Sequence, residues 1–163
     1  PLSTRQLERL LACRSVAHIE IDVGRLPDRT AQVEREVRDK LRNLHEAGFD
    51  VVISTSRAER HFGSKNEQLL FGAQVSALLT RLVRRAPRTL GFIVSKGGIT
   101  SNDVLSSGLK LVTARIVGQI HPGCSVVLTP SAHRYSEIPV VIFPGNVGEE
   151  DSLTLVFDRL SGR

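Results

Sequence analysis

The chain has 163 residues, which suits one domain with a core large enough to need no structural metal or disulfide. Cys13 and Cys124 lie far apart and lack zinc-site spacing, which argues against a disulfide framework or a zinc site and favours a cytoplasmic setting. The net charge of +5 suits phosphate-rich ligands, but the basic residues are spread among acidic ones and only 4% of residues are aromatic, so we expect no nucleic-acid partner.

The first part of the chain alternates helix-like and strand-like segments. We expect helices at residues 3–13, 30–47 and 66–85, and strands at residues 17–23, 49–54 and 90–94. A capping-box pattern from Ser3 to Gln6 opens the first helix, Gly48 follows the second, and Ser64 caps the third. This alternation indicates βαβ units, whose strands pair in parallel.

The second part predicts more strands. We expect a short helix at residues 103–107, strands at 111–120, 125–129 and 139–143, and a last helix at 149–160. Pro122 and Gly123 occupy the central positions of a four-residue turn with type II character, which indicates an antiparallel hairpin.

The predicted fold class is α/β, with a mostly parallel central sheet, helices on both faces and an antiparallel hairpin in the C-terminal half. We expect residues 1–163 to form a single domain. Because the chain begins at Pro1 and contains no methionine, we expect it to be part of a longer protein. The longest apolar stretches are strand-sized, so we expect no membrane partner.

Residues 91–103 read as a strand, a glycine turn and a helix start, with good N-cap residues at 100–103. Gly97 and Gly98 allow positive φ and a close approach of a ligand to bare backbone. Lys96 adds a positive charge beside amides freed at a helix start, so the segment predicts phosphate binding. The alternative is an ordinary tight turn between a strand and a helix.

A second glycine loop, residues 145–148, follows the predicted strand 139–143. If the strands before the two loops are parallel, both loops lie at one edge of the sheet and could bind one ligand from two sides. The second loop could also be only a turn. Glu149, Glu150 and Asp151 suit a helix N-terminus but would repel a phosphate unless they turn outward or Mg²⁺ bridges them, and both alternatives stay open.

No residue is identified as a catalytic base or as a metal ligand. The five histidines have no metal-site spacing. Asp22 and Asp103 are candidate bases or Mg²⁺ ligands, but a solvent-facing strand position and a helix cap account for them better. Residues 55–57, Thr-Ser-Arg, follow a predicted strand, which places polar groups where ligands of α/β sheets gather.

Five segments in order resemble the C-terminal domain of the four-carbon acid sugar kinases. They are residues 4–7, 55–57, 93–104, 114–123 and 140–148. Members of that family use ATP to phosphorylate small sugar acids such as threonate and erythronate. Their N-terminal domain carries the sugar-acid site and the catalytic aspartate, and their C-terminal domain carries the nucleotide site.

The resemblance implies that Gly97, Gly98, Ile99 and Thr100 lie along the phosphates of ATP, with Gly145 in the second loop. Many relatives have Asp where this chain has Ile99, which leaves a Mg²⁺ role at that position in doubt. With the loop residues considered above, the predicted nucleotide-binding set is Lys96, Gly97, Gly98, Ile99, Thr100, Ser101, Gly145, Asn146 and Gly148.

The resemblance therefore implies half of a sugar-acid kinase, with ATP and Mg²⁺ as cofactors and the catalytic residues in an N-terminal domain absent from this chain. Two other classes stay open: a nucleotide-sensing or interaction domain without catalysis, and a basic nucleic-acid-binding domain. A homodimer also stays open.

Overall fold

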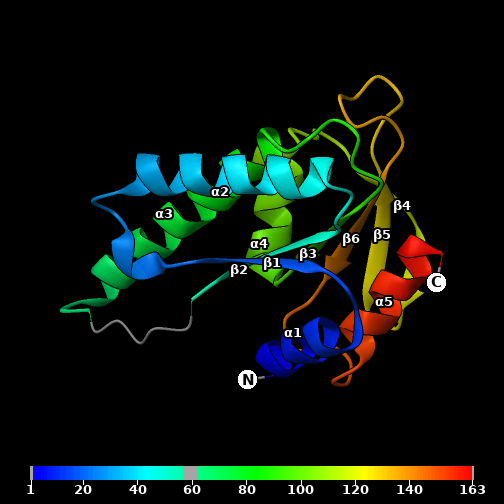
Figure 1. Ribbon diagram of the computed structural model, residues 1–163, viewed down its shortest axis with the longest axis horizontal. Helices are drawn as coiled ribbons and strands as arrows, with labels where there is room; N and C mark the ends of the chain where they lie inside the picture. The colour runs from blue at the N-terminus through cyan, green and yellow to red at the C-terminus, as the bar shows by residue number, and fades with distance from the viewer. Residues whose placement is uncertain (1, 57–61, 163) are drawn as a thin grey trace. The chain divides into compact units, whose positions relative to one another are not determined.

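The computed structural model describes residues 2–56 and 62–162, which form two compact units. The sheet unit comprises Pro1–Ser15 and Arg88–Arg163, and the βαβ unit comprises Val16–Pro87. Figure 1 labels the helices and strands of both. None of the helices within 2–56 and 62–162 is long and apolar enough to cross a membrane.

The βαβ unit is built from two short parallel strands and the helix that connects them. β1 (Ala17–Ile21) pairs in parallel with β2 (Val51–Thr55), and α2 (Thr30–Glu46) is the crossover between them. A 3-10 turn, η1 (Val23–Arg25), follows β1, and α3 (Lys65–Arg84) follows β2. One face of each element is apolar and buried, at Ile19 and Ile21 on β1 and at Val33, Val37 and Leu41 on α2.

Local signals set the helix ends in this unit. Gly48 adopts φ +84°, its N–H donates to the His45 carbonyl, and the Phe49 N–H donates to the Leu44 carbonyl. This is a Schellman ending, which requires a residue that tolerates positive φ. At the start of α3, the Ser64 hydroxyl accepts a hydrogen bond from the Glu67 N–H at 3.2 Å. Both ends were predicted and are confirmed.

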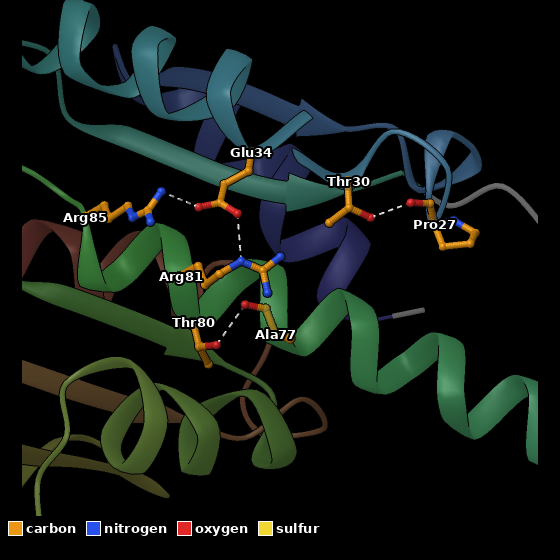
Figure 2. A network of polar contacts seen from close by, with 7 residues as sticks. All are labelled: Pro27, Thr30, Glu34, Ala77, Thr80, Arg81 and Arg85. Atoms are coloured by element: carbon orange, nitrogen blue, oxygen red, sulfur yellow. Dashed lines mark hydrogen bonds and ion pairs between the residues drawn. The ribbon is translucent and has the colours of Figure 1, made fainter. Parts of the chain in front are cut away.

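A polar cluster links α2 to α3 (Figure 2). The Glu34 carboxylate accepts from Arg81 Nε at 2.7 Å and from Arg85 Nη1 at 2.9 Å. Only 11% of the Glu34 side chain is exposed, so the two guanidinium groups compensate a carboxylate that is almost fully removed from water.

The sheet unit contains a four-stranded sheet with the order β3-β6-β5-β4. β3 (Ile93–Lys96) and β6 (Pro139–Phe143) are parallel, whereas β6 with β5 (Cys124–Leu128) and β5 with β4 (Arg115–His121) are antiparallel. Val127, Val140, Val141 and Phe143 are fully buried in its core. α5 (Ser152–Ser161) buries Val156 and Phe157 and contacts α1 (Leu2–Cys13).

The α/β class and the antiparallel hairpin are confirmed, and Gly123 has the positive φ, +77°, that its position in the turn predicts. The described strands form two sheets rather than one central sheet, with two parallel and two antiparallel pairings. Hydrophobic periodicity predicts that a segment is a strand, but not which partner it selects.

Three helix starts differ clearly from the predictions, and one of them is α5, which begins at Ser152 rather than at residue 149. α4 (Gly98–Asp103) begins directly after Gly97, which is its N-cap, and continues as a π-helix, η2 (Val104–Gly108). The predicted caps at 100–103 therefore lie inside the helix. α1 begins at Leu2, so Ser3 is not an N-cap, and its hydroxyl is used elsewhere.

Candidate functional site

The two glycine loops lie next to each other in the sheet unit. β3 and β6 are adjacent and parallel, so both loops leave the same edge of the sheet, as predicted. The Gly97 N–H donates to the Phe143 carbonyl at 2.8 Å, which ties the first loop to the end of β6. A Cβ added at Gly145 would lie 4.0 Å from the Cα of Gly97, so the loops approach each other through backbone.

The first loop needs glycine at one position and leaves space at the next. Gly97 adopts φ +112°, a conformation that L side chains rarely adopt. Gly98 does not have positive φ, and a Cβ built there meets no atom within 4 Å. Because the first amides of a helix lack intrahelical acceptors, the start of α4 presents backbone donors beside an open surface.

Lys96 connects the two loops. Its Nζ donates to the Pro144 carbonyl at 3.3 Å and lies 3.9 Å above the centroid of the Phe143 ring. Burial lowers the pKa of the Lys96 ammonium below its ordinary value, and the Cys124 thiol opposes part of that shift. The ammonium is therefore a partly desolvated positive charge, which attracts an anion more strongly than a fully hydrated one.

Two neighbouring hydroxyl residues have different surroundings. The Ser101 side chain is buried and donates to the Ser95 carbonyl at 2.9 Å, which fixes α4 to β3. Thr100 is half-buried, and its Oγ1 would lie 3.4 Å from a Cβ at Gly97. Of the predicted set, Ser101 therefore has a structural contact of its own, while the Ile99 side chain lies outside what the structure describes.

The second loop is held by side chains from two helices. Ser3 on α1 donates to the Gly145 carbonyl at 2.9 Å, and Gln6 donates to the Val147 and Glu149 carbonyls at 3.1 and 2.7 Å. On α5, the Ser152 hydroxyl accepts from the Glu149 N–H at 2.7 Å. Ser3 and Gln6 have the spacing of a capping box, but Gln6 also lies one turn before Leu10 on the same helix face, and both are buried. That shared face is the sequence signal for the contact of Gln6 with the loop.

The acidic residues after the second loop are exposed. The Glu150 carboxylate pairs with Arg5 Nε at 2.7 Å, and both side chains are more than half exposed. The Arg5 guanidinium offsets the Glu150 charge, which reduces the repulsion that a phosphate at this loop would meet. Glu149 and Asp151 are also exposed.

The β4–β5 turn packs against the second loop, a contact that the sequence interpretation did not anticipate. A Cβ at Gly123 would lie 2.9 Å from Val147 Cγ1, and one at Gly148 would lie 3.5 Å from the His121 ring. Asn146, in contrast, is exposed. The edge of the sheet thus carries three adjacent turns, two of which are the predicted glycine loops.

The segment at 55–57 belongs to the βαβ unit. The Ser56 hydroxyl accepts from the Val23 N–H at 3.1 Å, and the Asp22 carboxylate accepts from the Gly24 N–H at 2.8 Å. Both groups therefore stabilise the turn after β1. Arg57 lies outside the described residues.

Comparison with known protein families identifies the family of this chain. Residues 1–153 match the family described as the nucleotide-binding C-terminal domain. This chain belongs to that family. No curated protein matches the sequence.

Solved structures resemble the fold of this nucleotide-binding C-terminal domain. A DUF1537 protein from Bordetella bronchiseptica, with bound citrate and described as a domain-swapped dimer, has a TM-score of 0.73 at 20% identity, over 99% of this chain and 39% of its own. A DUF1537 protein from Haemophilus influenzae has a TM-score of 0.71 at 14% identity, over 98% of this chain and 38% of its own. The chain therefore spans less than two fifths of these proteins.

The residues of the nucleotide-binding domain fit a nucleotide better than a dedicated metal site. The unfilled space beside Gly98 and the Lys96 ammonium suit phosphate oxygens. Within 2–56 and 62–162, no group of three or more His, Cys, Asp or Glu residues could hold a metal ion. When Mg²⁺ binds together with a nucleotide, the phosphates and water supply most of its ligands.

Proposed function

We propose that this chain is the ATP-binding part of a kinase that phosphorylates a four-carbon sugar acid of the threonate or erythronate type. The observation that carries the proposal is the adjacency of the two glycine loops at the carboxyl ends of β3 and β6, with the Lys96 ammonium between them. Membership in a nucleotide-binding family supports nucleotide binding by this chain.

Within this proposal, Lys96, Gly97, Gly98, Ile99 and Thr100 bind the phosphates from one side. Gly145, Asn146 and Gly148 bind them from the other side. Phosphoryl transfer depends mainly on positioning and on charge stabilisation, which backbone donors and one ammonium can supply to ATP. Mg²⁺ would enter with the nucleotide and neutralise charge on its phosphates.

The base that activates the sugar-acid hydroxyl is assigned to the part of the protein outside this chain. The chain spans 39% of the Bordetella protein, so most of that protein has no counterpart here. We assign acceptor binding to a corresponding region outside this chain. Citrate bound to that protein is a small hydroxy acid, which supports an acid as the acceptor. Its domain-swapped dimer supports a homodimer for this chain, which analytical ultracentrifugation would test.

Isothermal titration calorimetry with ADP, with and without Mg²⁺, tests the nucleotide site. We expect saturable binding at a single site, with a dissociation constant that changes little between low and high salt compared with the steep loss for non-specific DNA binding. Duplex DNA at the same two salt concentrations is the comparison. Absence of ADP binding by the folded chain would reject the proposal.

A further inference from the structure

In the hydrogen bonds between α1 and the second glycine loop, side chains of α1 are the donors and backbone carbonyls are the acceptors. Ser3 and Gln6, one helical turn apart, donate to the carbonyls of Gly145, Val147 and Glu149. The Gln6 side chain is fully buried, so both hydrogen bonds of its amide form away from water. A buried amide that donates twice to one loop restricts the orientation of that loop.

Peptide geometry determines what these contacts do to the other side of the loop. The peptide bonds that follow Gly145 and Val147 are trans, and in a planar trans peptide the N–H points opposite to the preceding carbonyl. Because these carbonyls point to α1, the N–H groups of Asn146 and Gly148 point away from it. Among residues 2–56 and 62–162, neither N–H has a hydrogen-bond partner.

We infer that α1 aims the Asn146 and Gly148 N–H groups at the phosphate oxygens of the nucleotide, with Gln6 and Ser3 as positioning residues. This inference rests on the proposed function, because it deepens the same site. Two backbone donors that both point away from α1, a positive-φ glycine at 148 and the Lys96 ammonium at the Pro144 carbonyl match the kind of donor arrangement that binds phosphate.

The test compares variants of α1 by calorimetry with ADP and with inorganic pyrophosphate. Gln6→Glu keeps the side-chain shape but replaces the donating amide with a carboxylate that only accepts, and we expect ADP affinity to fall about tenfold. Ser3→Ala should lower the affinity for ADP about threefold, and Ser3→Thr, which keeps a hydroxyl, should bind ADP like the parent chain. Pyrophosphate should follow ADP, since the aimed groups bind phosphate.

Arg14→Ala is the matched control. Arg14 follows α1 directly, and its Nε donates to Asp158 Oδ1 at 2.6 Å, so it joins the end of α1 to α5 away from the loop carbonyls. We expect this variant to lower the melting temperature and to bind ADP within about twofold of the parent chain. A loss of affinity equal to that of Gln6→Glu would show that general loosening of α1 causes the effect and would overturn the inference.

Amide resonances supply a readout that a purely structural role would not change. On adding ADP, the amide protons of Asn146 and Gly148 should shift strongly in the parent chain and weakly in Ser3→Ala. If ADP binds but these resonances stay in place, the inference is wrong and the nucleotide site stands. If the parent chain binds no ADP, both fail. Should Gln6→Glu not fold, the Ser3 pair and the resonances still decide.

Discussion

At the scale of single residues, the glycines of the two loops have separate reasons for being glycine. Gly97 and Gly148 have positive φ, so the backbone itself requires them. Gly98 and Gly145 do not, and a Cβ at either would make no close contact. The lack of a side chain at Gly98 and Gly145 fits the clearance that the proposed nucleotide would need at these loops.

Gly98→Ala isolates that clearance. We expect ADP affinity to fall about tenfold or more, because a Cβ would occupy the space that a phosphate approaches, while the melting temperature stays the same or rises. Gly91→Ala is the control, since Gly91 also has open space around its Cβ position and lies before β3. Equal ADP binding by parent and Gly98→Ala would mean that the first loop is only a turn.

Lys96 links charge to both binding and stability. Burial lowers the pKa of the Lys96 ammonium, so Lys96 loses its proton at a lower pH in the folded protein than in the unfolded chain. The unfolded state then binds more protons between the two values, so the Lys96 contribution to stability rises with pH through that window. ADP affinity should fall over the same window, as the ammonium is lost.

Lys96→Ala should lower the affinity for ADP. It should also abolish the fall in ADP affinity at the pH at which Lys96 loses its proton. The loss relative to the parent chain should shrink at high salt, because the contribution is that of a point charge. Calorimetry at two pH values and two salt concentrations measures both effects. A loss that does not depend on salt would contradict this assignment.

At the scale of elements, the β4–β5 turn and the second glycine loop form one packed corner. Gly123 combines φ +77° with a Cβ position 2.9 Å from Val147 Cγ1. Gly123→Ala should therefore lower the free energy of unfolding by about 1–3 kcal/mol through backbone strain and overlap. Adding Val147→Ala should relieve the overlap but not the backbone strain. A double-mutant cycle measured by urea unfolding separates these two contributions. Strictly additive losses would show that the turn and the loop do not press on each other.

The Glu34 cluster joins α2 to α3 in the βαβ unit. Glu34→Ala should lower the free energy of unfolding by about 1–3 kcal/mol, because two arginines lose a shared acceptor that is mostly shielded from water. Asp39→Ala is the comparison: Asp39 lies 3.5 Å from Arg38 and 3.4 Å from Arg42, but its side chain is 42% exposed. Its loss should stay below about 1 kcal/mol. Similar losses for the two variants would contradict a special role for Glu34.

At the scale of the whole molecule, we expect this chain alone to phosphorylate no sugar acid. The reason is that the base and the acid-binding surface are assigned to a region outside it. Adding that region, in the same polypeptide or as a separate one, should produce ATP-dependent phosphorylation of a four-carbon acid, measured by a coupled ADP-release assay. Robust turnover by residues 1–163 would contradict this division.

Several features of the fold could be predicted from short stretches of sequence. The glycine at the end of α2, the Ser64 cap and the turn at Pro122 and Gly123 were predictable because each depends on backbone preferences within a few residues. The strand at 139–143 was predictable because its apolar run is short and bounded by turn residues. The position of the two glycine loops at one edge followed from reading both strands as parallel.

Strand pairing, the start of α4 and the contacts that hold the second loop depend on residues far apart in the sequence. Strand partners depend on packing between distant segments, so a periodic pattern could not separate one sheet from two. α4 begins after Gly97, whose N–H donates to the Phe143 carbonyl, 46 positions away in the numbering, and local capping rules do not consider contacts at that distance. Ser3 and Gln6 have the spacing of an ordinary capping box. Their acceptors in the structure are carbonyls of residues 145–149, which lie at the other end of the sequence and come within reach only when the sheet unit has folded.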